Sequence, residues 1–295
     1  MSKTVLVPPS YGLIHERGHL ILIKDGYRDL LVRQGIADFR TFLNQHGQTS
    51  TRLKGRTPLL SVLLESGEKV VVRPYSHGGL FRRFTRHLFL TGSRSFQELA
   101  LTEEIRSSGI PTVQPVGAVH CRTLPFFYRA FLLTLEIPGA EDLPHYLTRT
   151  GSSPSPESLS EKRETIRSVG RLVQQFHRQG FYHRDLQLKN ILVAERTPLL
   201  IDFDRCYRKK GLTIREMTRN ILRLDRSVEK WKRVGVALSK TDRLRFFLAY
   251  AEGNQEMKET LAKAVRYRGP RLFIHRLFWA LQTGITGFGN RRDRR

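Results

Sequence analysis

The stretch from His183 to Arg205 constrains the fold more than any other part of the chain. It reads HRDLQLKNILV, then a turn at AERTP, then LLIDFDR. The apolar runs ILV and LLI predict two short buried strands joined by that turn. Asp185 and Asn190 lie in the loop before the first strand, and Asp202 ends the second. The strand pair is therefore expected to bring two carboxylates and one amide together.

These three side chains suit phosphoryl transfer from a nucleotide. In that reaction one carboxylate orients the attacking hydroxyl and accepts its proton, while an amide and a second carboxylate hold Mg²⁺ against the phosphates. The spacing matches the protein-kinase motifs H-R-D-L-x-x-x-N and D-F-G. It predicts Asp185 as the catalytic base, Asn190 and Asp202 as metal ligands, and ATP with Mg²⁺ as the cofactors. Turns also favour Asp and Asn for purely structural reasons. Three unrelated turn residues are a poor explanation for this set, however, because all three match the motif spacing.

The charge balance points to an anionic partner. The 295-residue chain carries 51 Lys and Arg against 27 Asp and Glu, a formal net charge of +24. Nucleic acid, an anionic membrane surface or an anionic substrate would each suit this excess, and a basic surface that only aids solubility is the alternative.

Cysteine usage and the apolar runs bear on the compartment. Cys121 and Cys206 lack the spacing of a zinc site, and the chain begins without an apolar signal segment. No stretch approaches the roughly 20 apolar residues of a transmembrane helix. We therefore expect a cytoplasmic protein whose contact with any membrane is peripheral.

The upstream half predicts mainly strands and the downstream half mainly helices. PLLSVLLESGEKVVVRPY predicts a hairpin that turns at ESGE, and residues 93–108 predict a helix with Ser93 as its cap. TRTGSSPSPESLSEK, residues 148–162, predicts a flexible crossing between two parts of the molecule. Ser158 and Glu161 form a capping-box pattern for the helix that follows. The chain is therefore expected to be an α+β protein with a sheet-containing part and a helical part.

A cation on the strand VVVR should reach the nucleotide phosphates. Arg73 ends that run, and Lys69 lies on the same face of the strand because side chains alternate with a period of two. Glu98 is the expected helix acid that pairs with this cation, and Glu103 and Glu104 are its rivals. The sequence leaves open which of the two cations contacts the phosphates.

Three further residues complete the expected nucleotide site. Gly55, in LKGRTP, is the candidate for a turn that covers the phosphates, although a plain hairpin turn explains it equally well. Glu136 and Ile137 belong to the candidate segment whose backbone contacts adenine, and an ordinary strand end is the alternative there.

The stretch 51–235 resembles the lipopolysaccharide kinases of Gram-negative bacteria, most closely the 3-deoxy-D-manno-octulosonic acid (Kdo) kinases. The resemblance is carried by RPYSHGGLFRR, EIPGAEDL, HRDLQLKNIL, LIDFDR and NILRLDRSVEKW. It implies a protein-kinase-like bilobal fold, with an antiparallel sheet and one helix in an N-lobe (51–137) and a mainly helical C-lobe (138–240). Residues 1–50 would form an N-terminal extension of uncertain fold, and residues 241–295 a basic helical extension. The implied reaction is transfer of the ATP γ-phosphate to a sugar hydroxyl, of Kdo or heptose, in the lipopolysaccharide inner core.

Departures from the general kinase pattern bear on the acceptor. Asp204 stands where D-F-G has glycine, and no A-P-E segment follows it. Arg73 stands where V-A-I-K has lysine. The first two features fit a small or glycolipid acceptor better than a peptide.

An anionic glycolipid of the Kdo–lipid A type, at the cytoplasmic face of the inner membrane, would explain the positive charge. The candidate residues for binding it are Arg82, Arg83, Arg86, Lys189 and Arg205, and a solvated surface cation is the alternative for each. Near the C-terminus, RLFIHRLFWALQTGITGF predicts a helix with one apolar face that would either lie on a membrane or join the core.

Two other classes of function remain open. An atypical protein kinase, or a small-molecule kinase of the aminoglycoside type, would share these motifs. A non-catalytic kinase-like binding module should lack a catalytic residue, and none of the three is missing. Aromatic residues do not alternate with the basic runs, so no specific nucleic-acid partner is expected. The sequence leaves open the acceptor hydroxyl and the oligomeric state.

Overall fold

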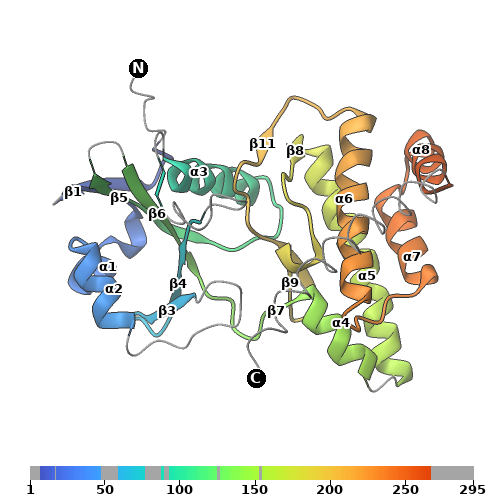
Figure 1. Ribbon diagram of the computed structural model, residues 1–295, viewed down its shortest axis with the longest axis horizontal. Coiled ribbons are helices and arrows are strands. Elements are labelled where there is room, and N and C mark those ends of the chain that lie inside the picture. Colours follow the sequence, from blue (N-terminus) through green and yellow to red (C-terminus); the bar gives the residue numbers. More distant parts are fainter. Residues whose placement is uncertain are drawn as a thin grey trace, which may run out of the picture.

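The computed structural model describes residues 7–16, 18–47, 59–76, 88–89, 93–124, 127–152 and 155–266. In this part of the chain a sheet-containing N-lobe lies beside a mainly helical C-lobe (Figure 1). The predicted two-lobed α+β fold is therefore confirmed. Within the described ranges no helix is long and apolar enough to cross a membrane.

One antiparallel sheet forms the centre of the N-lobe, with the strand order β1-β2-β5-β6-β4-β3. Its strands are β1 (Tyr11–Glu16), β2 (His19–Lys24), β3 (Leu60–Leu63), β4 (Lys69–Pro74), β5 (Pro115–Leu124) and β6 (Phe127–Leu135). The predicted hairpin is confirmed, since Leu60 of β3 pairs with Val72 of β4 across the ESGE turn. β4 also pairs with β6, so Arg73 projects from an internal strand of the sheet.

Helices cover both faces of this sheet. They are η1 (Asp25–Tyr27), α1 (Arg28–Arg33), α2 (Phe39–Gly47) and α3 (Arg94–Ser107). Successive side chains of a strand point to opposite faces, so Leu22 packs in one cluster with Leu99 of α3. Its neighbour Ile21 packs in a second cluster with Phe39 of α2. The sequence left the fold of residues 1–50 uncertain, and the structure places β1, β2, α1 and α2 in the N-lobe.

In its described residues the C-lobe contains five helices and several short strands. The helices are α4 (Leu143–Ser152), α5 (Pro156–Arg178), α6 (Ile214–Lys232), α7 (Lys240–Tyr250) and α8 (Gln255–Arg266). The short elements are β7 (Glu141–Asp142), β8 (Phe181–Tyr182), η3 (Leu188–Asn190), β9 (Ile191–Ala194), β10 (Thr197–Leu200) and β11 (Tyr207–Arg208). β9 and β10 form the predicted buried hairpin.

Two predictions about the start of the C-lobe were wrong. Residues 148–152 are not a crossing but the last turn of α4, whose apolar side, with Leu143 and Leu147, is buried in the core. The next helix begins one turn before the expected capping box. Ser155 is the N-cap, its hydroxyl accepts from the Ser158 amide at 3.1 Å, and Pro156 follows at the first helical position, where its missing N–H costs nothing. The lobes are joined instead by residues 136–142.

A second connection between the lobes lies in the loop after α3. Thr112 forms a parallel bridge with Leu200 at the end of β10. The Leu200 amide donates to the carbonyl of Pro111 at 3.1 Å, and the Thr112 hydroxyl donates to the Leu200 carbonyl at 2.6 Å. The α3–β5 loop is thus bonded to the C-lobe although it belongs to the N-lobe.

The C-lobe core continues past residue 240. Tyr250 and Leu261 belong to the same buried cluster as Phe176 of α5. α7 lies so close to α5 that a Cβ added at Gly170 would stand 2.8 Å from the backbone oxygen of Phe246. Helices α7 and α8 are therefore part of the lobe that carries the site.

Candidate active site

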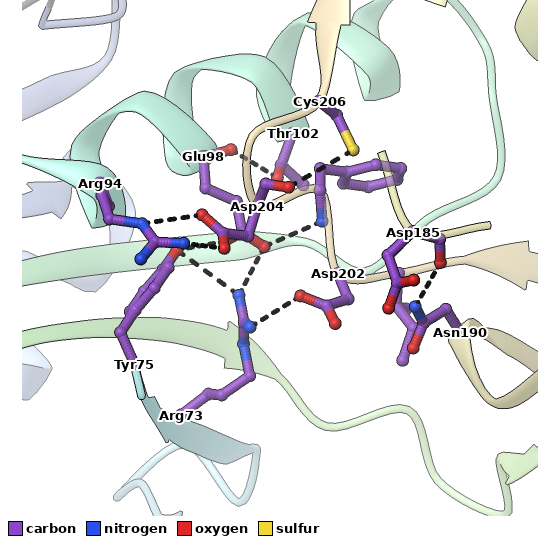
Figure 2. A network of polar contacts seen from close by, with 12 residues as sticks. Arg73, Tyr75, Arg94, Glu98, Thr102, Asp185, Asn190, Asp202, Asp204 and Cys206 are labelled. Atoms are coloured by element: carbon purple, nitrogen blue, oxygen red, sulfur yellow. Dashed lines mark hydrogen bonds and ion pairs between the residues drawn. The ribbon is translucent and has the colours of Figure 1, made fainter. Parts of the chain in front are cut away.

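The loop between β8 and β9 holds Asp185 and Asn190 together. The side-chain amide of Asn190 donates to the backbone carbonyl of Asp185 at 2.8 Å, closing the loop. The Asn190 carbonyl accepts from the Ile201 amide at 3.0 Å, which brings the residue before Asp202 alongside. Asn190 is buried, whereas the Asp185 side chain is 40% exposed. The structure thus brings together the three residues that the sequence singled out, with the Asp185 carboxylate open to a ligand (Figure 2).

The buried imidazoles of His183 and His177 support this loop through hydrogen bonds. His183 donates through Nε2 to the Ile201 carbonyl at 3.1 Å and accepts the Asp185 amide on Nδ1 at 3.2 Å. Asn220 of α6 donates to the His183 carbonyl at 2.7 Å, and its amide oxygen accepts from His177 at 2.9 Å. Burial lowers the pKa of His183, and it lowers the pKa of His177 to about 4. Both rings are therefore neutral and act as fixed hydrogen-bond partners.

Arg73 forms two ion pairs, one within the N-lobe and one that reaches the C-lobe. Its guanidinium lies 2.5 Å from Glu98 of α3 through Nη2 and 2.9 Å from Asp202 through Nη1 (Figure 2). Glu98 is only 2% exposed at its side chain, so the pair lies under the surface of the N-lobe. The rivals Glu103 and Glu104 contact Lys24 and Arg208 instead. Among the three acids, Glu98 is therefore the partner of Arg73.

The charges in this cluster depend on one another. Burial acts to lower the pKa of Arg73, but Glu98 and Asp202 outweigh it, and the pKa is raised well above its usual value. Burial acts to raise the pKa of Asp202, but Arg73, His183 and Lys189 together outweigh it, and the pKa is lowered. Burial raises the pKa of Glu98, and Arg73 offsets part of that rise. Arg73 thus stays cationic and keeps Asp202 ionised.

Glu98 also fixes the segment that carries Asp202. The backbone amide of Phe203 donates to Glu98 at 3.0 Å, and the Tyr75 hydroxyl donates to its other oxygen. Asp202 has φ of 67°, in the left-handed region that a residue with a Cβ enters only at a cost, typically at functional sites. Arg94, at the start of α3, pairs with Asp204. The sequence reasoning missed Tyr75 and Arg94, because an aromatic beside a strand and a helix-start arginine carry no local signal for such a role.

The other predicted nucleotide residues lie around the link between the lobes. Lys69 begins β4, and its side chain forms no ion pair with a described residue, while its carbonyl accepts from the Glu136 amide at 2.8 Å. The Glu136 carboxylate accepts from the Ser61 hydroxyl at 2.5 Å, and the Ile137 carbonyl accepts from the Ala140 amide at 3.1 Å. Gly55 lies outside the described residues.

Two cations face Asp185. Lys189 lies 4.0 Å from Oδ2 of Asp185, and Arg223 of α6 lies 3.7 Å from Oδ1. Gln187 donates to that same Oδ1 at 2.5 Å. Arg205 is exposed. The candidates Arg82, Arg83 and Arg86, and the predicted amphipathic helix of the C-terminus, lie outside the described residues. Arg223 was missed because an arginine on a basic helix resembles a solvated residue.

Comparison with known proteins agrees with this geometry. The model of the lipopolysaccharide kinase (Kdo/WaaP) family matches residues 40–250. A 3-deoxy-D-manno-octulosonic acid kinase of Pasteurella multocida is 34% identical over 172 residues, which cover 56% of this chain and 67% of that enzyme. The enzyme of the same name from Actinobacillus succinogenes is 30% identical over 212 residues, 68% of this chain and 84% of its own.

One solved structure, of WaaP in complex with acyl carrier protein, shares the fold. It superposes with a TM-score of 0.54 at 17% sequence identity, covering 88% of this chain and 95% of that chain.

Proposed function

Because the chain belongs to the lipopolysaccharide kinase (Kdo/WaaP) family, we propose that it transfers the γ-phosphate of ATP to a hydroxyl of a Kdo residue in the lipopolysaccharide inner core. The observation that carries the proposal is the convergence of Asp185, Asn190 and Asp202 beside the Arg73–Glu98 pair. The names of the aligned relatives favour Kdo over heptose as the acceptor sugar.

In this proposal Asp185 acts as the base. It orients the acceptor hydroxyl and takes its proton while the new bond forms between that oxygen and the γ-phosphorus, and the bond from the γ-phosphorus to the β-γ bridging oxygen breaks. The carboxylate is held in place from its own backbone, since the Asn190 side chain binds the Asp185 carbonyl. His183 fixes the same turn through the Asp185 amide, so the carboxylate needs no further movement to meet an acceptor.

Magnesium would be held by Asn190 and Asp202. The Asn190 amide nitrogen is used by Asp185, which leaves its oxygen for a metal, and one Asp202 oxygen accepts from Arg73, which leaves the other. Mg²⁺ prefers oxygen ligands and is commonly held by one or two carboxylates together with substrate phosphates. The donor set therefore fits, and the ion would neutralise charge on the transferring phosphate.

The nucleotide would bind between the lobes. Arg73 would contact its phosphates, oriented by Glu98, and Lys69 lies on the same face of β4 as a weaker candidate. Glu136 and Ile137 would offer backbone groups to adenine from the start of the interlobe link. Gly55 is proposed to cover the phosphates.

The acceptor is proposed to be an anionic glycolipid at the cytoplasmic face of the inner membrane. The net charge of +24 supports electrostatic attraction to such a surface, where each basic residue contributes about 1 kcal/mol. Lys189 and Arg205 are the described residues proposed to contact it, and Arg82 and Arg83 would add to them.

The test is incubation of the protein with Mg·ATP and Kdo–lipid A, followed by mass spectrometry of the lipid. A gain of one phosphate by wild type and none by Asp185→Asn is the expected result. A parallel reaction with a heptosylated core tests the choice of sugar, because a phosphate found on heptose alone would change the assigned acceptor from Kdo to heptose. Retained labelling by Asp185→Asn would contradict the assigned base.

A further inference from the structure

The Asp185 carboxylate, the proposed base, lies between two cations. Arg223 stands 3.7 Å from one oxygen of Asp185 and Lys189 stands 4.0 Å from the other. Both separations exceed a hydrogen bond, so each cation is attracted to the carboxylate without being bonded to it. Two cations therefore flank the Asp185 carboxylate, beside the place where the acceptor hydroxyl is expected to lie.

Arg223 also keeps a donor without an acceptor. Its Nε is buried and has no hydrogen-bond partner among the described residues. A buried N–H that stays unpaired is costly, and more so when it is charged. The Arg223 side chain as a whole is 37% exposed, so it is not closed off from solvent on the side of Asp185.

Two hydrogen bonds of α6, one before Arg223 and one after it, fix the position of this residue. One turn before it, Asn220 donates to the backbone carbonyl of His183 at 2.7 Å. One turn after it, the Ser227 hydroxyl accepts from the backbone amide of Leu188 at 3.0 Å. Both partners belong to the loop that carries Asp185. Arg223 is therefore held opposite this carboxylate by the same bonds that dock α6 to the loop.

Positive charge continues from Arg223 along the helix. Arg219 precedes Arg223 by four residues, and Arg226 and Lys230 follow it at spacings of three and four, which places these three residues on one side of α6 with Arg223. All three are exposed, and none forms an ion pair with any residue that the structure describes. At 1.5 Å per residue, the row from Arg219 to Lys230 is about 17 Å long. Arg223, the second member of the row, is the one that lies beside Asp185.

We propose that Arg223, with Lys189 as a second contact, binds an oxyanion of the acceptor close to the reacting hydroxyl, and so selects acceptors that carry this oxyanion over neutral ones. This inference rests on the proposed function. A guanidinium binds a carboxylate or a phosphate through two parallel N–H bonds, which positions the sugar as well as attracting it. The sugar's own carboxylate and a neighbouring phosphate of the glycolipid are the two sources of such an oxyanion.

The acceptor fits this contact better than the nucleotide. Arg223 belongs to α6 of the C-lobe, and its ion-pair partner in the described chain is Asp185, the residue that receives the acceptor proton. The proposed phosphate contact of the nucleotide, Arg73, approaches from the N-lobe and meets Asp202.

The experiment compares acceptors in wild type and in Arg223→Gln. The acceptors are Kdo–lipid A, the same lipid with its sugar carboxylate converted to a methyl ester, and the same lipid with its lipid A phosphates removed. We expect the ester to lower kcat/KM of wild type at least tenfold, and Arg223→Gln to treat acid and ester alike while its KM for ATP stays unchanged. If removal of the phosphates has this effect instead, the oxyanion is a phosphate and the proposal stands with that source.

Control variants and a binding measurement distinguish failure of the Arg223 proposal from failure of the proposed function. Arg171→Gln removes an exposed arginine of α5 that pairs with Glu164 and should keep the wild-type preference. Arg223→Lys should regain part of it. An Arg223→Gln enzyme with unaltered preference among all three acceptors, or with only a raised KM for ATP, would overturn the proposal. Calorimetric binding of Kdo–lipid A to wild type and Arg223→Gln needs no turnover, so a chain that binds but transfers nothing would refute the proposed function and still test Arg223.

Discussion

Arg94 and Asp204 form a two-pronged ion pair that joins the start of α3 to the segment after Asp202. Nε of Arg94 donates to Oδ1 of Asp204 at 3.1 Å, and Nη2 donates to Oδ2 (Figure 2). Both side chains are largely withdrawn from solvent. Where the general kinase motif has a flexible glycine, this chain has a residue that is bonded to the helix carrying Glu98. The orientation of Asp202 is thereby tied to the position of α3.

Asp204→Asn should therefore weaken both the fold and the site. Loss of one partner leaves the Arg94 charge partly buried without its counter-charge, which costs about 1–3 kcal/mol. Urea unfolding should show this loss of unfolding free energy, and kcat should fall because Asp202 is held less well. The double variant Arg94→Asp with Asp204→Arg should recover part of both. Full activity and stability in Asp204→Asn would show that the pair has no role.

Arg73→Lys should lose activity although the charge is kept. A lysine ammonium is a single point, whereas the guanidinium contacts Glu98 and Asp202 through different nitrogens. Loss of one charge-assisted bond, worth about 1.5–3 kcal/mol, predicts a fall in kcat/KM of about 10- to 100-fold.

The matched pair Arg73→Met and Lys69→Met decides between the two cations. Steady-state kinetics at varied ATP should show the larger loss in Arg73→Met. A larger loss in Lys69→Met would transfer the phosphate contact to Lys69.

Acid should destabilise the protein through its buried imidazoles. The folded-state pKa of His177 is lowered to about 4, so between pH 6.5 and 4 the unfolded chain binds more protons there than the folded chain. Stability therefore falls as the pH falls through this window. For His177 alone the loss from pH 7 to pH 5 is about 2 kcal/mol. Urea unfolding at both pH values should show a difference smaller by that amount in His177→Gln. An unchanged difference would mean that His177 is charged or exposed in the fold.

Gly170→Ala should test the attachment of α7 to the lobe. Its Cβ would meet the Phe246 backbone oxygen at 2.8 Å and the Ala249 Cβ at 3.0 Å. Overpacking of this kind typically costs about 1–3 kcal/mol. Gly211→Ala is the control, since a Cβ added there would have no atom within 4 Å and the φ of Gly211 is ordinary. Equal melting temperatures of the two variants would contradict the close packing.

The parts of the site that were predictable depend on short sequence distances. Asp185, Asn190 and Asp202 lie within eighteen residues around one hairpin, so apolar runs and turn residues were enough to place them. The phosphate-binding cation could be narrowed to Arg73 or Lys69, because the alternation of side chains along a strand is a local pattern. That Arg73 pairs with Glu98 depends on how α3 packs on the sheet, which no local pattern reports.

The misjudged parts depend on packing between distant segments. β2 joins the sheet by pairing with β5, as in His19 with Cys121, and no local pattern reports a partner a hundred residues away. The composition of residues 148–162 indicated a flexible crossing, but burial of Leu143 and Leu147 outweighs Gly151 in α4. Asn220 and Arg223 resemble solvated helix residues until α6 is seen against the catalytic loop.

The bridge between Thr112 and Leu200 limits how the two lobes can move. Together with the link at 136–142 it joins the backbones of the two lobes at two points, and two points define an axis of rotation. We therefore expect the lobes to swing about that line rather than slide past each other. Any swing wide enough to exchange nucleotide must stretch Arg73 from Asp202 and Arg94 from Asp204. The ion pairs that order the site should therefore also hold the lobes closed. We expect product release to be slower when these ion pairs are stronger.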